Sequence, residues 1–248
     1  MKSITEIIEI ANQYVLELPP CAEEVVLPAG NEINSLIDHT LLKAEATPDQ
    51  VKKLCQEALT YQFASVCVNP VYAPLVAELL AGSNVKTCGV VGFPLGASPA
   101  TNKVLETLYL LSVGATEIDM VIHIGALKSK AYGQVLNEIQ AVVQAAHAQN
   151  AIVKVIIETA LLSKQEKIMA CLLSQKAGAD FVKTSTGFST AGASVEDVDL
   201  MYRVVGPQVK VKASGGIRDL EIALAMVKAG ASRLGTSSGV QIAKDAAE

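Results

Sequence analysis

Eight short apolar runs separated by helix-length segments are the feature that most limits how this chain folds. Several of these runs, such as AIVKVII, are almost continuously apolar, so a strand formed there needs cover on both faces. Eight strands that each lead into a helix predict an α/β protein, a (β/α)₈ TIM barrel, with an open doubly wound sheet as the alternative. The expected strands lie near residues 36–38, 63–69, 85–91, 117–122, 152–158, 180–184, 208–213 and 232–235.

Capping signals mark the helices between these runs. The segments TPDQ from Thr47 and SKQE from Ser163 fit the capping-box pattern, and Asn69-Pro70 and Ser98-Pro99 also indicate helix starts. Glycine-alanine pairs at 114–115, 178–179 and 230–231 precede three of the expected strands. A glycine at the end of a helix adopts the left-handed conformation, so these pairs predict short connections from helix to strand.

The length of 248 residues and the 50% hydrophobic content fit one barrel domain with a large core. Residues 34–248 are expected to form this catalytic barrel. Residues 1–33 precede the first strand and alternate acidic with apolar residues at helical spacing. They predict a helical extension that packs across or beside the lower end of the barrel.

The charge and the cysteines narrow the class of partner. A formal net charge of −5 without any basic tract argues against nucleic acid or an anionic membrane as the main partner. The five cysteines are odd in number and show no CxxC spacing, which is typical of reduced thiols in the cytoplasm. The first twenty residues lack the unbroken apolar stretch of a signal peptide or a membrane span.

Two lysines each end an apolar run and precede a turn of small residues: Lys183 in FVKTSTG and Lys212 in VKVKASGG. A buried amine next to a second cation is suited to covalent chemistry on a carbonyl, because the neutral amine is the nucleophile. A second ammonium about 5–6 Å away costs the charged form about 3 kcal/mol, or about two pKa units. Lys183 is the expected nucleophile, since the following TSTG leaves room for substrate, and Lys212 is the perturbing cation.

Further polar residues lie on the expected strands and face the same end of the barrel. Asp119 is the expected proton carrier between the lysines and the substrate. For Asp38 and Lys154, a supporting role in proton relay and a structural salt bridge are both open. Period-two alternation also places Glu158 on the same face as Lys154.

Glycine-rich turns after the last strands predict a phosphate site. TIM barrels commonly bind phosphate with the loops after strands 7 and 8, and small residues there expose backbone N–H groups. Arg218 or Arg233 is close enough in sequence to add positive charge. A small phosphorylated carbonyl compound is therefore the expected substrate. The expected phosphate-binding residues are Gly187, Ser214, Gly215, Gly216, Gly235, Thr236, Ser237 and Ser238.

Seven motifs, in this order, resemble the deoxyribose-phosphate aldolase family: LIDHTLLK, SVCVNP, EIDMVIHIGALK, KVIIETALL, FVKTSTGFS, VKASGGIR and RLGTSSG. The resemblance spans about residues 33–240. It implies a cytoplasmic class I aldolase of deoxyribose phosphate catabolism that needs no metal or other cofactor. Its reaction is the reversible cleavage of 2-deoxy-D-ribose 5-phosphate to D-glyceraldehyde 3-phosphate and acetaldehyde.

The resemblance also assigns roles to residues. The Schiff-base lysine of the family matches Lys183, its second lysine matches Lys212 and its proton-relay aspartate matches Asp119, while Asp38 and Lys154 match further polar residues of that site. Expected partners are the sugar phosphate and the aldehydes, with the chain assembling as a homo-oligomer, either a dimer or a tetramer.

The chain departs from the family pattern at three places. His123 stands where the family often has asparagine, and Ala160 where it often has glycine. The carboxyl terminus ends in AKDAAE, without the tyrosine that some members use as a proton carrier.

Three alternatives belong to other classes. One is another Schiff-base barrel enzyme, either a transaldolase or a ketose-phosphate aldolase. A second is a non-catalytic phosphate-binding barrel, which would have no use for the two lysines. A third is a metal-dependent aldolase or isomerase, against which His39, His123 and His147 are scattered without ligand spacing.

Overall fold

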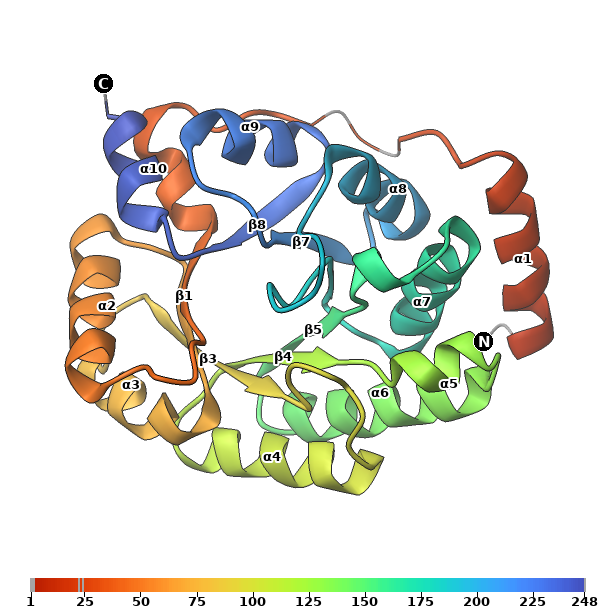
Figure 1. Ribbon diagram of the computed structural model, residues 1–248, viewed down its shortest axis with the longest axis horizontal. Coiled ribbons are helices and arrows are strands. Elements are labelled where there is room, and N and C mark those ends of the chain that lie inside the picture. Colours follow the sequence, from red (N-terminus) through yellow and green to blue (C-terminus); the bar gives the residue numbers. More distant parts are fainter. Residues whose placement is uncertain (1–2, 22, 24, 248) are drawn as a thin grey trace.

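A computed structural model describes residues 3–21, 23 and 25–247, and it confirms the TIM barrel. Eight parallel strands close in sequential order, with β1 hydrogen-bonded to both β2 and β8 (Figure 1). The strands are β1 (Ile37–Leu41), β2 (Ser65–Val68), β3 (Lys86–Val91), β4 (Glu117–Val121), β5 (Ile152–Ile156), β6 (Phe181–Lys183), β7 (Lys210–Ser214) and β8 (Ala231–Thr236).

Helices form a ring around the strands (Figure 1). They are α2 (Pro48–Tyr61), α3 (Ala73–Leu79), α4 (Ala100–Ser112), α5 (Ile124–Lys128), α6 (Tyr132–His147), α7 (Lys164–Ala177), α8 (Val195–Val205), α9 (Leu220–Lys228) and α10 (Gly239–Asp245), with short 3₁₀ turns η2 (Pro70–Tyr72) and η3 (Thr159–Leu161). None of the described helices is both long and apolar enough to cross a bilayer.

The predicted caps begin and end these helices. Thr47 and Ser163 each accept a hydrogen bond from the third helical N–H group, and the side chain of that third residue accepts one from the Thr47 or Ser163 N–H, which completes both capping boxes. Gly178 ends α7 in the left-handed conformation, with φ +84°. These local signals explain why the sequence divides into strands and helices where it does.

The amino-terminal segment begins with α1 (Ile4–Leu16), which lies outside the helical ring against α7 (Figure 1). Ile7 and Ala11 are buried in this contact, and the Lys164 ammonium donates to the Val15 carbonyl at 2.9 Å. The chain then passes the lower end of the barrel near Lys210 and reaches β1 through the 3₁₀ turn η1 (Gly30–Leu36). The helix itself therefore lies on the flank of the barrel.

The main apolar core lies between the strands and the helices, whereas the barrel interior holds most of the buried charged side chains and a smaller cluster that includes Cys67, Cys88 and Val90. On β5, Val153 and Val155 belong to the apolar core. Lys154 lies between them in sequence and its side chain, fully buried, contacts acidic residues of β1 and β4. Because alternate strand residues face opposite sides, a strand such as β5 supplies both the apolar core and the charged interior.

Candidate active site

Seven charged side chains from six strands meet inside the barrel. Six of them have side chains exposed by 5% or less, and the seventh, on β8, is 13% exposed. They are Asp38 (β1), Glu117 and Asp119 (β4), Lys154 (β5), Lys183 (β6), Lys212 (β7) and Arg233 (β8). The structure thus brings together all five polar residues expected at the site and adds Glu117 and Arg233.

Asp119 is the centre of the cluster. Its Oδ2 atom accepts hydrogen bonds from Lys183 at 2.6 Å and from Lys212 at 2.7 Å, and its Oδ1 atom accepts one from Lys154 at 3.0 Å. Burial raises the pKa of Asp119, but the three ammonium groups outweigh burial and hold the pKa well below its ordinary value. Asp119 is therefore an ionised carboxylate that accepts hydrogen bonds from three ammonium groups.

A lower layer of ion pairs supports Asp119. Lys212 lies 2.5 Å from Asp38, which also pairs with Arg233, and Glu117 lies 2.5 Å from Lys154 and 2.9 Å from Arg233. Burial lowers the pKa values of Lys212 and Lys154, but the surrounding carboxylates outweigh burial and raise both above the ordinary lysine value. Lys212 and Lys154 are therefore permanent cations.

The position of Arg233 corrects one expectation. Arg233 was one of two arginines considered for the phosphate loops, but its guanidinium points into the lower interior and pairs with Asp38 and Glu117. It lies two residues before Gly235 on the same face of β8, one layer farther from the open end. Arg218 instead lines the cavity at that end.

A cavity of about 450 Å³ opens at the carboxyl ends of β1, β6, β7 and β8. It is lined by Lys183 and by all eight residues expected at the phosphate loops, together with the cations Lys43 and Arg218. Active sites of TIM barrels lie at this end of the strands. The arrangement therefore places one amine and a set of backbone N–H groups around one small-molecule site.

The loops around this cavity leave polar groups without protein partners. Gly215 and Gly216 have φ values of +88° and +81°, which side chains rarely adopt. The Ser214 hydroxyl is buried and has no hydrogen-bond partner among the described residues. A Cβ atom at Gly235 would lie 2.2 Å from that hydroxyl oxygen, so glycine is required for Ser214 to face the cavity. An unpartnered buried hydroxyl is suited to a ligand oxygen.

An aromatic pair borders the cavity. Phe93, from the loop after β3, and Phe188, from the loop after β6, meet edge to face with centroids 5.3 Å apart. Phe188 is 53% exposed and lines the cavity beside Gly187. The pair therefore gives the site an apolar border next to its charged floor.

One further residue, Glu158, lies differently from the expectation. Glu158 does not share a face with Lys154, because β5 ends at Ile156 and Glu158 adopts φ +57°. Its carboxylate contacts Thr186.

His123 begins α5, where its Nδ1 atom accepts a hydrogen bond from the Ala126 N–H at 3.1 Å. Ala160 lies within η3.

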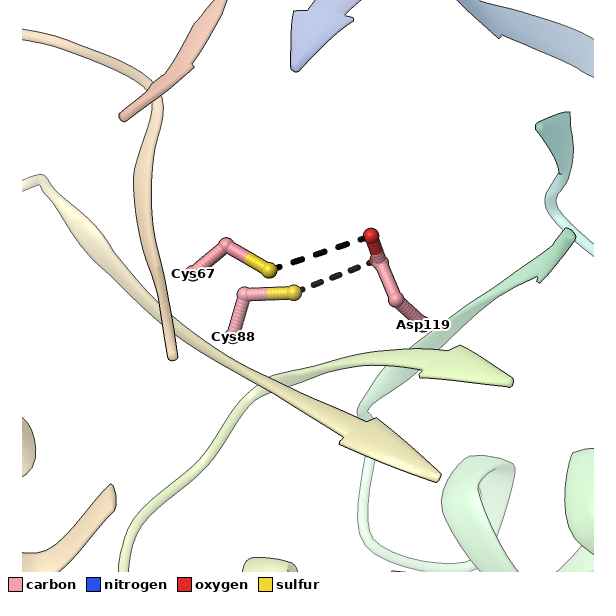
Figure 2. A group of neighbouring side chains, drawn as sticks. All are labelled: Cys67, Cys88 and Asp119. Carbon is pink, nitrogen blue, oxygen red and sulfur yellow. Dashed lines mark hydrogen bonds between the residues drawn. The ribbon is translucent and has the colours of Figure 1, made fainter. Parts of the chain in front are cut away.

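Two thiols were not expected at the site. Cys67 on β2 and Cys88 on β3 are register partners, and both side chains point toward Asp119 (Figure 2). The Cys88 Sγ atom lies 3.2 Å from Asp119 Oδ1, and the Cys67 Sγ atom lies 3.9 Å from Oδ2. Only the pairing of β2 with β3 brings the thiols together, so the spacing of the cysteines along the chain carried no signal.

This group does not fit a metal ion. A metal would need two thiolates and a free carboxylate oxygen, but both Asp119 oxygens already accept hydrogen bonds from ammonium groups. Burial raises the pKa of Cys88 well above its ordinary value, so this thiol keeps its proton. The Lys154 ammonium, 3.5 Å from Cys88 Sγ, would also repel a cation.

Comparison with known proteins identifies the family. The model of the DeoC/LacD family aldolases matches residues 33–245. The chain belongs to this aldolase family. The deoxyribose-phosphate aldolase of Clostridium tetani is 58% identical over 86% of this chain and 99% of its own length. That of Brevibacillus brevis is 59% identical over 85% of this chain and 94% of its own.

A solved structure agrees with the family in fold. The tetrameric deoxyribose phosphate aldolase from Aeropyrum pernix superimposes with a TM-score of 0.83 at 35% identity. The superposition covers 98% of each chain. The match to the family thus extends over the whole barrel, including every strand that supplies a charged residue to the site.

Proposed function

We propose that this chain is a class I deoxyribose-phosphate aldolase that cleaves 2-deoxy-D-ribose 5-phosphate to D-glyceraldehyde 3-phosphate and acetaldehyde, and forms it in reverse. The observation that carries the proposal is the sharing of Asp119 Oδ2 by Lys183 and Lys212 at one end of a cavity whose other walls are glycine-rich loops. The relatives named above support the substrate.

The charge balance of the cluster favours a reactive amine. The described cluster holds three carboxylates, Asp38, Glu117 and Asp119, against three lysines and Arg233. One cation is in excess if all are charged. An arginine cannot lose its proton, and Lys154 and Lys212 are held as cations. Lys183 lines the cavity and makes its described ion pair with Asp119 only, so it is the amine that we assign as the nucleophile.

The proposed cleavage uses Lys183 as the nucleophile and Asp119 as the proton carrier. The Lys183 amine attacks C1 of the open-chain sugar, and Asp119 passes the proton needed for loss of water from the carbinolamine. Removal of the proton from the C3 hydroxyl breaks the C2–C3 bond, and its electrons move into the protonated imine to give an enamine. Protonation of C2 and hydrolysis release acetaldehyde and restore the amine. Lys212 remains a cation beside the nitrogen throughout.

The substrate phosphate lies at the opposite end of the cavity. Gly187, Gly215 and Gly216 supply backbone N–H groups, Ser214, Ser237 and Ser238 supply further donors, and Arg218 adds charge. Thr236 is placed to shape this loop, because its hydroxyl donates to the Ile217 carbonyl at 2.6 Å and accepts from the Ser238 N–H at 2.9 Å.

Borohydride trapping tests the assignment. Reduction in the presence of acetaldehyde should fix an ethyl group on Lys183, located by peptide mass mapping. A label on another lysine would contradict the mechanism, and no label would favour a non-catalytic phosphate-binding barrel.

Dialysis against a chelator tests the metal-dependent alternative. We expect turnover to survive the dialysis, whereas a loss of turnover that zinc restores would favour a metal-dependent enzyme.

We also propose that the enzyme is cytoplasmic and assembles as a homo-oligomer. The five cysteines are all free, which suits a reducing compartment. The outer face of α4 exposes Leu105, Leu108 and Tyr109, and the tetrameric relative supports self-association. Sedimentation of the wild-type chain and of Leu105→Glu tests this, since a monomer in both would contradict it.

A further inference from the structure

Glu158 is a buried carboxylate that forms no ion pair with any described residue. It is 2% exposed and lies just beyond the end of β5 in the left-handed conformation. Burying an ionised group without a cation is costly unless hydrogen bonds compensate. An apolar side chain of similar size would fill this place at lower cost. The hydrogen bonds that this carboxylate accepts therefore account for a glutamate at this buried position.

The described hydrogen bonds of its carboxylate all come from one residue of the loop after β6. The Thr186 N–H donates to Glu158 Oε2 at 3.3 Å and to Oε1 at 3.4 Å, and the Thr186 hydroxyl also donates to Oε2. The same hydroxyl oxygen accepts a hydrogen bond from the Phe188 N–H at 3.1 Å. Glu158 thus holds the residues on both sides of Gly187.

The far end of this loop is held independently. The Ala193 N–H donates to the Ser214 carbonyl at 3.1 Å. A Cβ atom at Gly192 would lie 2.2 Å from the Gly215 carbonyl oxygen, so these two loops are in backbone contact. The loop after β6 is therefore hydrogen-bonded near its start to Glu158, which follows β5, and near its end to Ser214 of β7.

Gly187 lies between these two hydrogen-bonded positions, Thr186 and Ala193, and borders the cavity. Its φ is +85°, and no atom lies within 4 Å of the position a Cβ would take. The open space beside Gly187 and the fixed backbone on either side are what a phosphate oxygen needs to approach an N–H group closely.

We propose that Glu158 is a positioning residue for the substrate phosphate: through Thr186 it orients the Gly187 backbone toward the phosphate. The inference rests on the proposed function, and specifically on phosphate binding at the Gly187 loop. Glu158 does not touch the reacting carbon atoms. Its loss should therefore weaken recognition of the phosphate more than it slows bond cleavage.

The test compares a substrate with and without the phosphate. kcat and KM are measured for 2-deoxyribose 5-phosphate and for unphosphorylated 2-deoxyribose with the full-length chain. Glu158→Ala should raise KM for the phosphorylated sugar by about 10- to 100-fold. kcat/KM for the unphosphorylated sugar should fall by less than about threefold. The ratio of kcat/KM for the phosphorylated sugar to that for the unphosphorylated sugar should therefore decrease.

Three matched variants separate positioning from general disruption. Thr186→Val removes the linking hydroxyl and should reproduce the Glu158→Ala effect, whereas Thr186→Ser keeps the hydroxyl and should keep the preference. In the double variant, the Thr186→Val change should add little to Glu158→Ala, because both break one connection. Thr159 is the adjacent buried residue, and its hydroxyl has no described partner. Thr159→Val should leave the preference intact.

Two outcomes would overturn the proposal. Equal losses for both sugars in Glu158→Ala and Thr186→Val would show a general structural role, and full additivity would show that the residues act separately. If Glu158→Ala does not fold, Glu158→Gln with Thr186→Val decides the same question. A wild-type enzyme that does not prefer the phosphorylated sugar would instead contradict the phosphate assignment itself.

Discussion

Lys183 and Lys212 share a single oxygen atom, Asp119 Oδ2, at 2.6 and 2.7 Å. The two nitrogens therefore cannot be farther apart than the sum of these distances. Their surroundings nonetheless differ. Lys212 also pairs with Asp38 in the fully buried layer, whereas Lys183 lines the cavity and makes its described ion pair with Asp119 only. This asymmetry is the basis on which we propose Lys183 as the reacting amine and Lys212 as the cation beside it.

Replacement of Lys183 should abolish catalysis without unfolding the barrel. In Lys183→Leu, Asp119 keeps Lys154 and Lys212 as partners, so the remaining charges stay paired. We expect turnover to fall by about 10⁴-fold or more and the borohydride adduct to disappear. Steady-state kinetics and intact mass measure both. Wild-type turnover in this variant would refute the assignment.

Replacement of Lys212 should damage both stability and rate. Lys212→Leu leaves Asp38 and Asp119 with less positive charge in a fully buried layer, which costs about 3–5 kcal/mol of unfolding free energy. Without the second cation, the ammonium form of the catalytic amine is favoured. The acidic limb of the pH–rate profile should therefore move to higher pH. Lys212→Arg is the control that keeps the charge, and an unshifted profile in Lys212→Leu would show that Lys212 does not tune the amine.

The enzyme should lose stability in acid. Asp38 and Asp119 both have pKa values held well below the ordinary 3.8, for Asp119 by three lysines and for Asp38 mainly by Lys212 and Arg233. Below about pH 4 the unfolded chain therefore binds more protons than the folded chain. The two carboxylates stabilise the fold above that pH, and this stabilisation is lost as the pH falls below it. Urea unfolding at pH 7 and at pH 3 measures the effect. An equal midpoint at both values would contradict the charges assigned to this layer.

A methyl group at Gly235 should weaken phosphate binding. Its Cβ would lie 2.2 Å from the Ser214 hydroxyl and displace that group from the cavity. We expect Gly235→Ala to raise KM for the phosphorylated sugar about tenfold or more, with a smaller change in kcat. Gly133→Ala is the matched control, since its Cβ would meet only Ile4 at an ordinary 3.6 Å. A similar rise in both variants would argue against a role for Ser214.

The barrel and the lysine pair could be predicted because their signals are local. Capping residues mark the helices, and period-two alternation places Lys154 on the face opposite to Val153 and Val155. The same rule contained a signal for Arg233 that was missed: it shares a face with Gly235, so it had to lie inside the barrel.

Other features depend on pairing between distant segments. Cys88 reaches Asp119 only because β3 pairs with β4, and no spacing along the chain indicates this. Period-two alternation predicts the wrong face for Glu158, because β5 ends at Ile156 and Glu158 adopts the left-handed conformation. The carboxylate that follows this strand end hydrogen-bonds to Thr186, which lies far from it in sequence, so neighbouring residues along the chain do not indicate its position.

The pairing of Asp38 with Arg233 joins the first strand of the barrel to the last. A fragment that contained only one end of the chain would lose this ion pair, and loss of one partner of a buried pair is strongly destabilising. Partial barrels are therefore penalised electrostatically as well as by exposed strand edges. Closure of the ring therefore couples the two ends of the chain, and we expect separate halves of the barrel to be less stable than the whole.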